Sequence, residues 1–176
     1  MKKMIAMLLA LAVMFSFAAC GTTATEPTTA PTETVQNVEG SMEELLNKVV
    51  EIQPVEFMGG TMPIDLTDLE GLAYNTGLNS AEGITEAAMF GPMMGSIAYS
   101  MVMVRTAEGA DVKAIAEGMK NGIDTRKWIC VEADDLQVVS YGDVVMLIMV
   151  ASDSGMTSQS FVDAFAQVCG GDVTVY

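Results

Sequence analysis

The chain has 176 residues, of which 51% are hydrophobic and 18% are charged, so it is long enough for one globular domain and too apolar to be disordered throughout. Acidic residues outnumber basic ones by 23 to 8, and the formal charge of −15 argues against binding of nucleic acid through its phosphates. The sequence contains no histidine, which argues against Ser-His-Asp and Cys-His catalysis and against histidine-ligated zinc.

The first residues have the pattern of a bacterial lipoprotein signal. A basic start precedes an apolar stretch over 4–19, which is shorter than the ~20 residues that span a bilayer. Small residues stand directly before Cys20 and resemble a lipobox, although Phe17 occupies a position where an aliphatic residue is commonest. We predict that 1–19 is a lipoprotein signal peptide and that Cys20 is lipidated. The alternatives are an uncleaved anchor and an ordinary signal.

A Thr- and Pro-rich segment follows the cysteine. Seven of the residues in 21–40 are Thr, two are Pro, and the only large aliphatic residues are two valines. Such a segment buries too little apolar surface to offset its ordering entropy. We therefore expect 20–40 to be a lipidated cysteine with a disordered tether, and 41–176 to be a single extracytoplasmic domain.

The domain begins with helical patterns. Ser41 and Glu44 form a capping box, and apolar residues at helical spacing then predict a helix to about Ile52. Glycines and prolines over 53–63 indicate a loop. A second, short helix is predicted to start near Thr67.

The remaining sequence repeats one order of elements, strand, strand, helix, twice. We predict an α+β two-layer sandwich, in which a four-stranded antiparallel sheet from two strand-strand-helix units carries its helices on one face, with an additional N-terminal helix. The predicted ranges are 84–90, 96–105 and 110–123 for the first unit, and 136–141, 144–151 and 157–169 for the second.

Two of these strands lack the alternation of a sheet with one wet face. Residues 96–105 and 144–150 are apolar on both faces. The second face of the sheet is therefore covered, either by the first helices or by a partner.

From about Ile97 to Ser152, the order and texture of the sequence resemble a known family. An apolar strand, a helix with internal charge pairs, the tryptophan-containing segment RKWICVEADD and an apolar hairpin follow one another. They resemble an uncharacterised lipoprotein family of Gram-positive bacteria, domain of unknown function 4358. The resemblance implies a small lipid-anchored extracytoplasmic domain and no assigned catalytic residues. A Tyr-Pro step typical of the family is replaced here by Cys130-Val131-Glu132.

Two cysteines remain besides Cys20. In an exported protein Cys130 and Cys169 are candidates for a disulfide bond. The alternative is that both are small buried hydrophobic residues. A cysteine nucleophile is disfavoured because no histidine is present to activate it.

Acidic groups offer little chemistry of their own. Asp65, Asp68 and Glu70 suggest a weak cation site, but acids at a helix N-terminus are expected from the helix dipole. Asp134 and Asp135 precede a strand, where acids are commonly a solvated turn. Aromatic residues make up only 6% of the chain, so the sugar-binding cleft of a glycosidase is not indicated.

Methionine is abundant, with 16 residues in the chain. Met89, Met93 and Met94 form the densest group outside the signal. Methionines at strand and helix positions are usually adaptable core residues, and this is the favoured interpretation. The alternatives are a Cu(I) site and an adaptable contact surface.

Together these features predict a lipid-anchored extracytoplasmic binding or scaffolding module on the outer face of a Gram-positive cytoplasmic membrane. We expect no enzymatic activity, no cofactor and no metal site. The expected partners are the membrane, through Cys20, and an envelope protein or peptide. The alternative is a carboxylate-dependent envelope hydrolase or an accessory subunit of an envelope enzyme.

Overall fold

The computed structural model describes residues 37–176. The predicted signal peptide, the lipidation site at Cys20 and most of the tether lie outside the described residues, so those predictions stay as they are.

The described chain is an α+β structure in which four helices pack on one six-stranded antiparallel open sheet. The strand order is β1-β2-β3-β5-β4-β6. The strands are β1 (Gly59–Pro63), β2 (Ile84–Pro92), β3 (Tyr99–Thr106), β4 (Asp135–Tyr141), β5 (Val144–Val150) and β6 (Thr174–Val175). The helices are α1 (Met42–Ile52), α2 (Leu69–Thr76), α3 (Val112–Gly122) and α4 (Ser158–Cys169), with a short 3-10 turn η1 at Ser152–Ser154.

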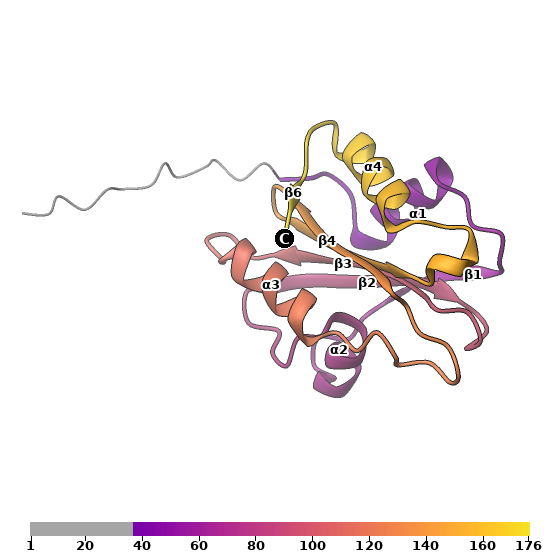
Figure 1. Cartoon of the computed structure of the whole chain (residues 1–176). Helices are drawn as coiled ribbons and strands as arrows, with labels where there is room; N and C mark the ends of the chain where they lie inside the picture. The colour runs from indigo at the N-terminus through magenta and orange to yellow at the C-terminus, as the bar shows by residue number, and fades with distance from the viewer. Residues whose placement is uncertain (1–36) are drawn as a thin grey trace, which may run out of the picture. The chain divides into compact units, whose positions relative to one another are not determined.

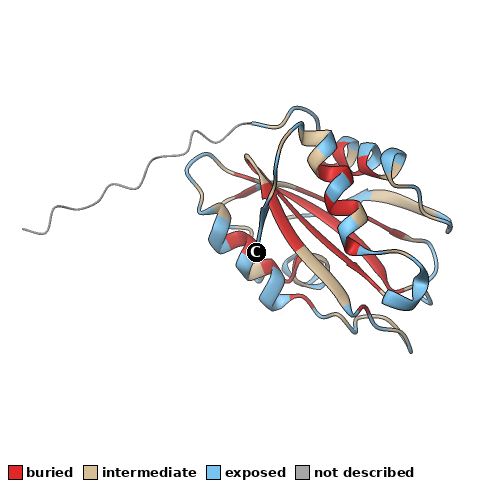
Figure 2. Ribbon diagram, turned by 45° about the horizontal axis from the view of Figure 1, so that its top comes forward, coloured by how far each residue is buried: buried red, intermediate tan, exposed pale blue. Residues whose placement is uncertain are grey.

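Helices cover both faces of the sheet, α1 and α4 on one side and α2 and α3 on the other (Figure 1). The central strands supply a core to each side. In β3, Met101 and Met103 face α1 and α4, whereas Val102 and Val104 face α2 and α3. The sheet is accordingly the buried middle layer between two helical layers (Figure 2). Both faces of the sheet are thus covered from within the chain, which accounts for the missing alternation.

Two parts of the predicted fold are wrong. The sheet has six strands, because β1 and β6 add an outer strand on either side of the predicted four. The helices also do not share one face, since α3 and α4 lie on opposite sides and make three layers where two were expected. A two-fold axis through the β3–β5 pairing would put α3 and α4 on the same face, so the two strand-strand-helix units are not related by symmetry.

The predicted helix starts are confirmed by their caps. Ser41 Oγ accepts from Glu44 N at 3.2 Å, and the Glu44 carboxylate accepts from Ser41 N at 2.9 Å. Asp68 caps α2, and Thr157 caps α4. These caps satisfy backbone N–H groups that have no partner within their helices.

The sheet has two ends that matter for function. Glu86, Arg105 and Asp143 lie together at one end, which we call the attachment end because the described chain begins there. Pro92 and Tyr99 lie at the other, which we call the far end. At ~3.3 Å per residue, the strands separate the two ends by about 20 Å.

Candidate functional site

An arginine at the attachment end holds the segment that leads into α1. Arg105 donates to the carbonyl of Val38 at 3.0 Å and to that of Gly40 at 2.6 Å. The same guanidinium forms an ion pair with the carboxylate of Asp143, a residue that is only 6% exposed. Charge-assisted hydrogen bonds of this kind are stronger than neutral ones.

Two carboxylates lie beside Arg105, and we call Arg105, Asp143 and Glu86 the attachment cluster. Asp143 accepts from Val38 N at 2.8 Å, and Glu86 accepts from Met42 N at 2.8 Å. Glu86 also lies 3.6 Å from Arg105 Nε. The backbone from residue 38 to residue 42 is therefore fixed by three side chains, from β2, from β3 and from the turn between β4 and β5. No sequence motif marks these three residues as a cluster. The sequence feature that points to it is the charge of Arg105 at the end of an otherwise apolar strand.

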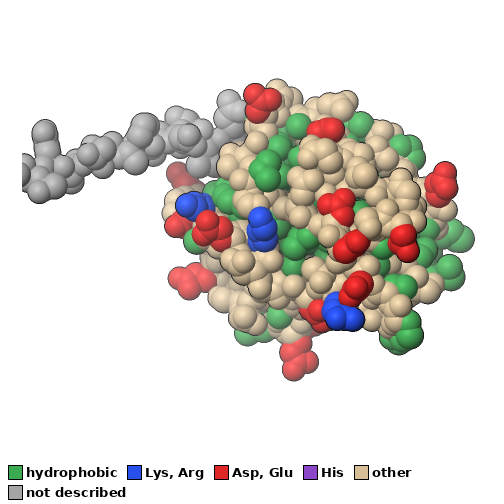
Figure 3. All heavy atoms as spheres, in the orientation of Figure 1, with side chains coloured by type: hydrophobic (Ala, Val, Ile, Leu, Met, Phe, Trp, Pro, Cys, Tyr) green, Lys and Arg blue, Asp and Glu red, His purple; other side chains and the backbone are tan. Residues whose placement is uncertain are grey.

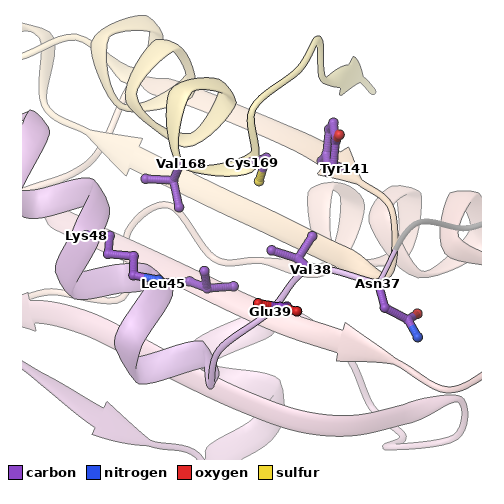
Figure 4. Close-up of a pocket in the computed structure, with 8 residues that line it drawn as sticks. All are labelled: Asn37, Val38, Glu39, Leu45, Lys48, Tyr141, Val168 and Cys169. Atoms are coloured by element: carbon purple, nitrogen blue, oxygen red, sulfur yellow. The ribbon is translucent and has the colours of Figure 1, made fainter.

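A pocket of about 480 Å³ lies beside this segment, between α1, the end of α4 and the end of β4 (Figure 4). Val38 and Lys48 form part of its wall, and Tyr141 and Cys169 face it from the opposite side. Burial, assisted by the charge of Asp143, raises the pKa of Cys169 to about 12. The thiol is therefore protonated at neutral pH and is no nucleophile. Part of the pocket wall is the N-terminal segment that Arg105 holds. We therefore interpret the pocket as a gap beside that segment and not as a ligand site.

A second pocket, of about 580 Å³, opens at the far end. It is formed by 96–98, 130–132, Asp134 and 151–154. Concave sites with several polar groups are the usual places for ligands and catalysis. This far-end pocket is the place where carboxylate chemistry would have to occur.

The acidic pair beside this pocket is engaged in local hydrogen bonds. Asp134 accepts from Ser152 N and Ser152 Oγ, each at 2.7 Å. These bonds lower the pKa of Asp134 below its ordinary value. A general acid needs a raised pKa, so Asp134 is poorly suited to that role. Asp135 accepts from the backbone and hydroxyl of Ser158 at the start of α4.

The other acidic group is also explained by local structure. Asp65 accepts from Thr67 N and Oγ1 at 2.8 and 2.7 Å, and these bonds lower its pKa. Asp68 accepts from Gly71 N at 3.0 Å as the N-cap of α2. Within the described residues no three acidic or cysteine side chains gather closely enough to hold a metal ion.

The two cysteines lie at opposite ends of β4 and are both free. Cys169 faces the pocket at Tyr141, whereas Cys130 lines the far-end pocket near Asp134. The length of β4 separates these positions by about 20 Å, and a disulfide needs Cα atoms within about 7 Å. Cys130 and Cys169, the candidate disulfide pair, are therefore separate free thiols in this structure, because the strand holds them apart.

Exposed methionines form a surface at the far end, beside β1. Met58 is 80% exposed, Met93 is 75%, Met94 is 63% and Met62 is 53%. Hydrophobic side chains gather at the right-hand margin of Figure 3, where β1 lies in Figure 1. These four methionines are not core residues, so the favoured sequence interpretation is wrong for Met93 and Met94. We call Met58, Met62 and Met93, together with the half-buried Met89 that pairs with Met62, the methionine surface; it extends from the middle of β2 to the far end.

The register explains how this surface arises. Met62 pairs with Met89 and Gly60 with Gly91 across β1 and β2. Met93 N donates to Met58 O at 2.9 Å, which continues the ladder by one pair. The signal in the sequence is a Met-x-Gly-x-Met pattern that occurs twice, at 58–62 and 89–93.

One half-buried lysine also escapes prediction. Lys127 Nζ donates to Ser100 Oγ at 3.2 Å and to Tyr74 O at 3.3 Å, and it lies 4.9 Å from the Tyr74 ring centroid. Burial lowers the pKa of Lys127 to about 8. A serine next to such a lysine is a known nucleophile arrangement. Here Ser100 is only 1% exposed, so its hydroxyl is closed to a substrate.

No protein-family model, curated protein or solved structure matches the chain significantly. Among the described residues, no helix has the length and apolar character needed to cross a bilayer. The protein is a three-layer α+β domain with an attachment cluster at one end of its sheet and a methionine surface that reaches the other end.

Proposed function

We propose that this protein is a lipid-anchored extracytoplasmic binding or scaffolding module on the outer face of a Gram-positive cytoplasmic membrane, without enzymatic activity of its own. The lipobox-like sequence before Cys20 and the Thr- and Pro-rich segment after it support the anchor. The resemblance of 97–152 to the uncharacterised lipoprotein family, domain of unknown function 4358, supports the same localisation and remains part of the proposal.

One structural observation carries the binding role. The chain enters the domain at the attachment end, whereas the methionine surface and the far-end pocket lie at the opposite end of the strands. A lipid on Cys20 would therefore tether the domain by its attachment end and leave the far end free to reach a partner. Exposed apolar surface that points into the envelope space is typical of a protein–protein contact.

The partner we propose is an extended, basic segment of an envelope protein or peptide. β1 is an outer strand of the sheet, and Gly59 and Thr61 present backbone groups along its free edge, which ends at Pro63 because proline has no N–H. Methionine side chains adapt to varied partners. The formal charge of −15 favours a partner that carries basic residues.

Cross-linking in intact cells tests this proposal. A photo-reactive residue at Thr61, on β1, is expected to capture a defined envelope protein or peptide. The same residue at Glu117, exposed on α3, is the matched control and is expected to capture none in common with it. Identical patterns from both positions would contradict a binding role for the far end.

Mass spectrometry of the mature protein tests the anchor separately. A diacylated Cys20 at the new N-terminus is the expected result. The acyl chains then supply the membrane affinity, because anionic lipid repels an acidic protein. An intact Met1 or an unmodified Cys20 would contradict it.

A second candidate is a carboxylate-dependent envelope hydrolase or an accessory subunit of an envelope enzyme. The observation in its favour is the far-end pocket, which contains Glu132 and Asp134. Purified protein is expected to release no product from cell-wall fragments. Product that disappears in Glu132→Gln or Asp134→Asn, with folding retained, would replace the binding proposal with this one.

A further inference from the structure

The two Met-x-Gly-x-Met segments pair in antiparallel register around their glycines. Met58 lies opposite Met93, Gly60 opposite Gly91, and Met62 opposite Met89. Because side chains alternate along a strand, these three pairs project from the same face of the sheet. The four methionines therefore occupy the corners of a rectangle of backbone positions, and a pair of glycines forms its middle.

The middle of this rectangle has room for a small ligand. A Cβ placed on Gly60 would meet no atom within 4 Å. A Cβ placed on Gly91 would lie 2.9 Å from the terminal methyl of Met89, so that side chain already leans over the glycine floor. Each corner lies roughly 7 Å along the strand from the glycine pair, a distance that a flexible methionine and one metal–sulfur bond together cover.

We propose that the methionine surface is a binding site for a soft monovalent metal ion, Cu(I). Thioether sulfur is a ligand that favours Cu(I) over hard cations such as Mg²⁺ and Ca²⁺. It needs no deprotonation, so binding would be nearly independent of pH. The excess of 23 acidic over 8 basic residues favours a cation at the surface.

This proposal goes beyond a contact surface for a protein partner. A protein partner requires apolar area, which leucine supplies as well as methionine does, whereas a metal ion requires the sulfur lone pairs. Met→Leu substitution keeps volume and hydrophobicity nearly constant and removes the sulfur. It therefore separates the two roles: the leucine variant keeps the cross-link from Thr61 and loses the metal.

The test is titration of the detergent-solubilised full chain with Ag(I), an oxidation-stable probe, and with Cu(I) against a chromophoric Cu(I) chelator. Cys130→Ser and Cys169→Ser are included throughout because thiolates bind both ions. The expected result is one ion per chain and shifts of the methionine methyl NMR signals of Met58, Met62, Met89 and Met93.

The variant M58L/M62L/M93L is expected to weaken binding by at least about 100-fold, since it removes three of four ligands. These three residues are exposed, so the variant is expected to fold, which circular dichroism verifies. Met94→Leu is the matched control, because Met94 is exposed and adjacent but outside the ladder, and it retains affinity. Unchanged affinity in the triple variant, equal loss in Met94→Leu, or ions bound without methyl shifts would each overturn the proposal.

Discussion

Among single residues, Lys127 has the shifted pKa that matters most near neutral pH. Its ammonium is half-buried between Tyr74 and Trp128, with Ser100 and the Tyr74 carbonyl as hydrogen-bond acceptors. Burial lowers its pKa from 10.5 to about 8, and the charge of Asp124 opposes this only in part. The folded state therefore binds a proton less tightly than the unfolded chain does.

This shift predicts a stability that rises with pH. Between about pH 8, the folded-state pKa, and about pH 10.5, the pKa in the unfolded chain, the unfolded state holds more protons, so raising the pH favours folding. Urea unfolding at pH 7.5, 8.5 and 9.5 is expected to show this rise in the wild type relative to Lys127→Met. The two proteins share all other titrating groups. If the difference between their free energies of unfolding were the same at all three pH values, the lowered pKa of Lys127 would be contradicted.

The two free thiols are expected to differ in reactivity. Cys130 is exposed, whereas burial and the charge of Asp143 raise the pKa of Cys169 to about 12. Thiolate is the reactive form, so at pH 8 we expect Cys169 to react more than about tenfold more slowly with a disulfide reagent. Cys130→Ser is expected to remove the fast phase, and Cys169→Ser to leave it intact. A single fast phase for both thiols would mean that Cys169 is more accessible than the structure describes.

At the scale of elements, the helices were predictable because their signals are local. The capping box at Ser41 and Glu44 marks the start of α1, and Thr157 marks the start of α4, each within one turn of the residues it caps. β1 was missed because Gly59, Gly60 and Pro63 indicate a loop, and such residues are tolerated in an outer strand. The strand forms because β2 offers it a free edge, which is not a local property.

The layering was not predictable for a related reason. β3 and β5 are apolar on both faces, so nothing in their own sequences distinguishes the side of α3 from that of α4. The candidate sites follow the same rule. Met89 and Met93 stand out in the sequence as neighbours, but Met58 joins them only through the β1–β2 register.

The attachment cluster links the N-terminal segment to three strands, and breaking it is expected to be costly. Arg105→Met removes the partner of Asp143, which is only 6% exposed, and so leaves a buried carboxylate unpaired. We expect a loss of roughly 3–5 kcal/mol in the free energy of unfolding, measured with urea. Lys113→Met breaks the exposed pair with Glu117 on α3 and is expected to cost less than about 0.5 kcal/mol. Equal costs would show that Arg105 contributes no more than a surface charge.

At the scale of the whole molecule, the fold separates attachment from binding. The segment at 38–42 is tied to the sheet by Arg105, Asp143 and Glu86, so this segment cannot turn independently of the strands. The far-end pocket lies about 20 Å away at the other strand ends, and the methionine surface extends from the middle of β2 toward that end. The attachment cluster therefore fixes the point at which the N-terminal segment leaves the sheet.

The position of the attachment end predicts which end of the lipidated protein lies nearer to the membrane on average. A fluorophore on Glu39→Cys reports the attachment end, and one on Gly95→Cys reports the far end, where a side chain added at position 95 meets no atom within 4 Å. With Cys130 and Cys169 replaced by Ser, a quencher on lipid headgroups is expected to quench the first label more strongly. Adding Arg105→Met releases the segment and is expected to reduce the difference. Equal quenching of both labels in the protein that keeps Arg105 would mean that the attachment end lies no nearer to the membrane than the far end, which would contradict the separation of attachment from binding.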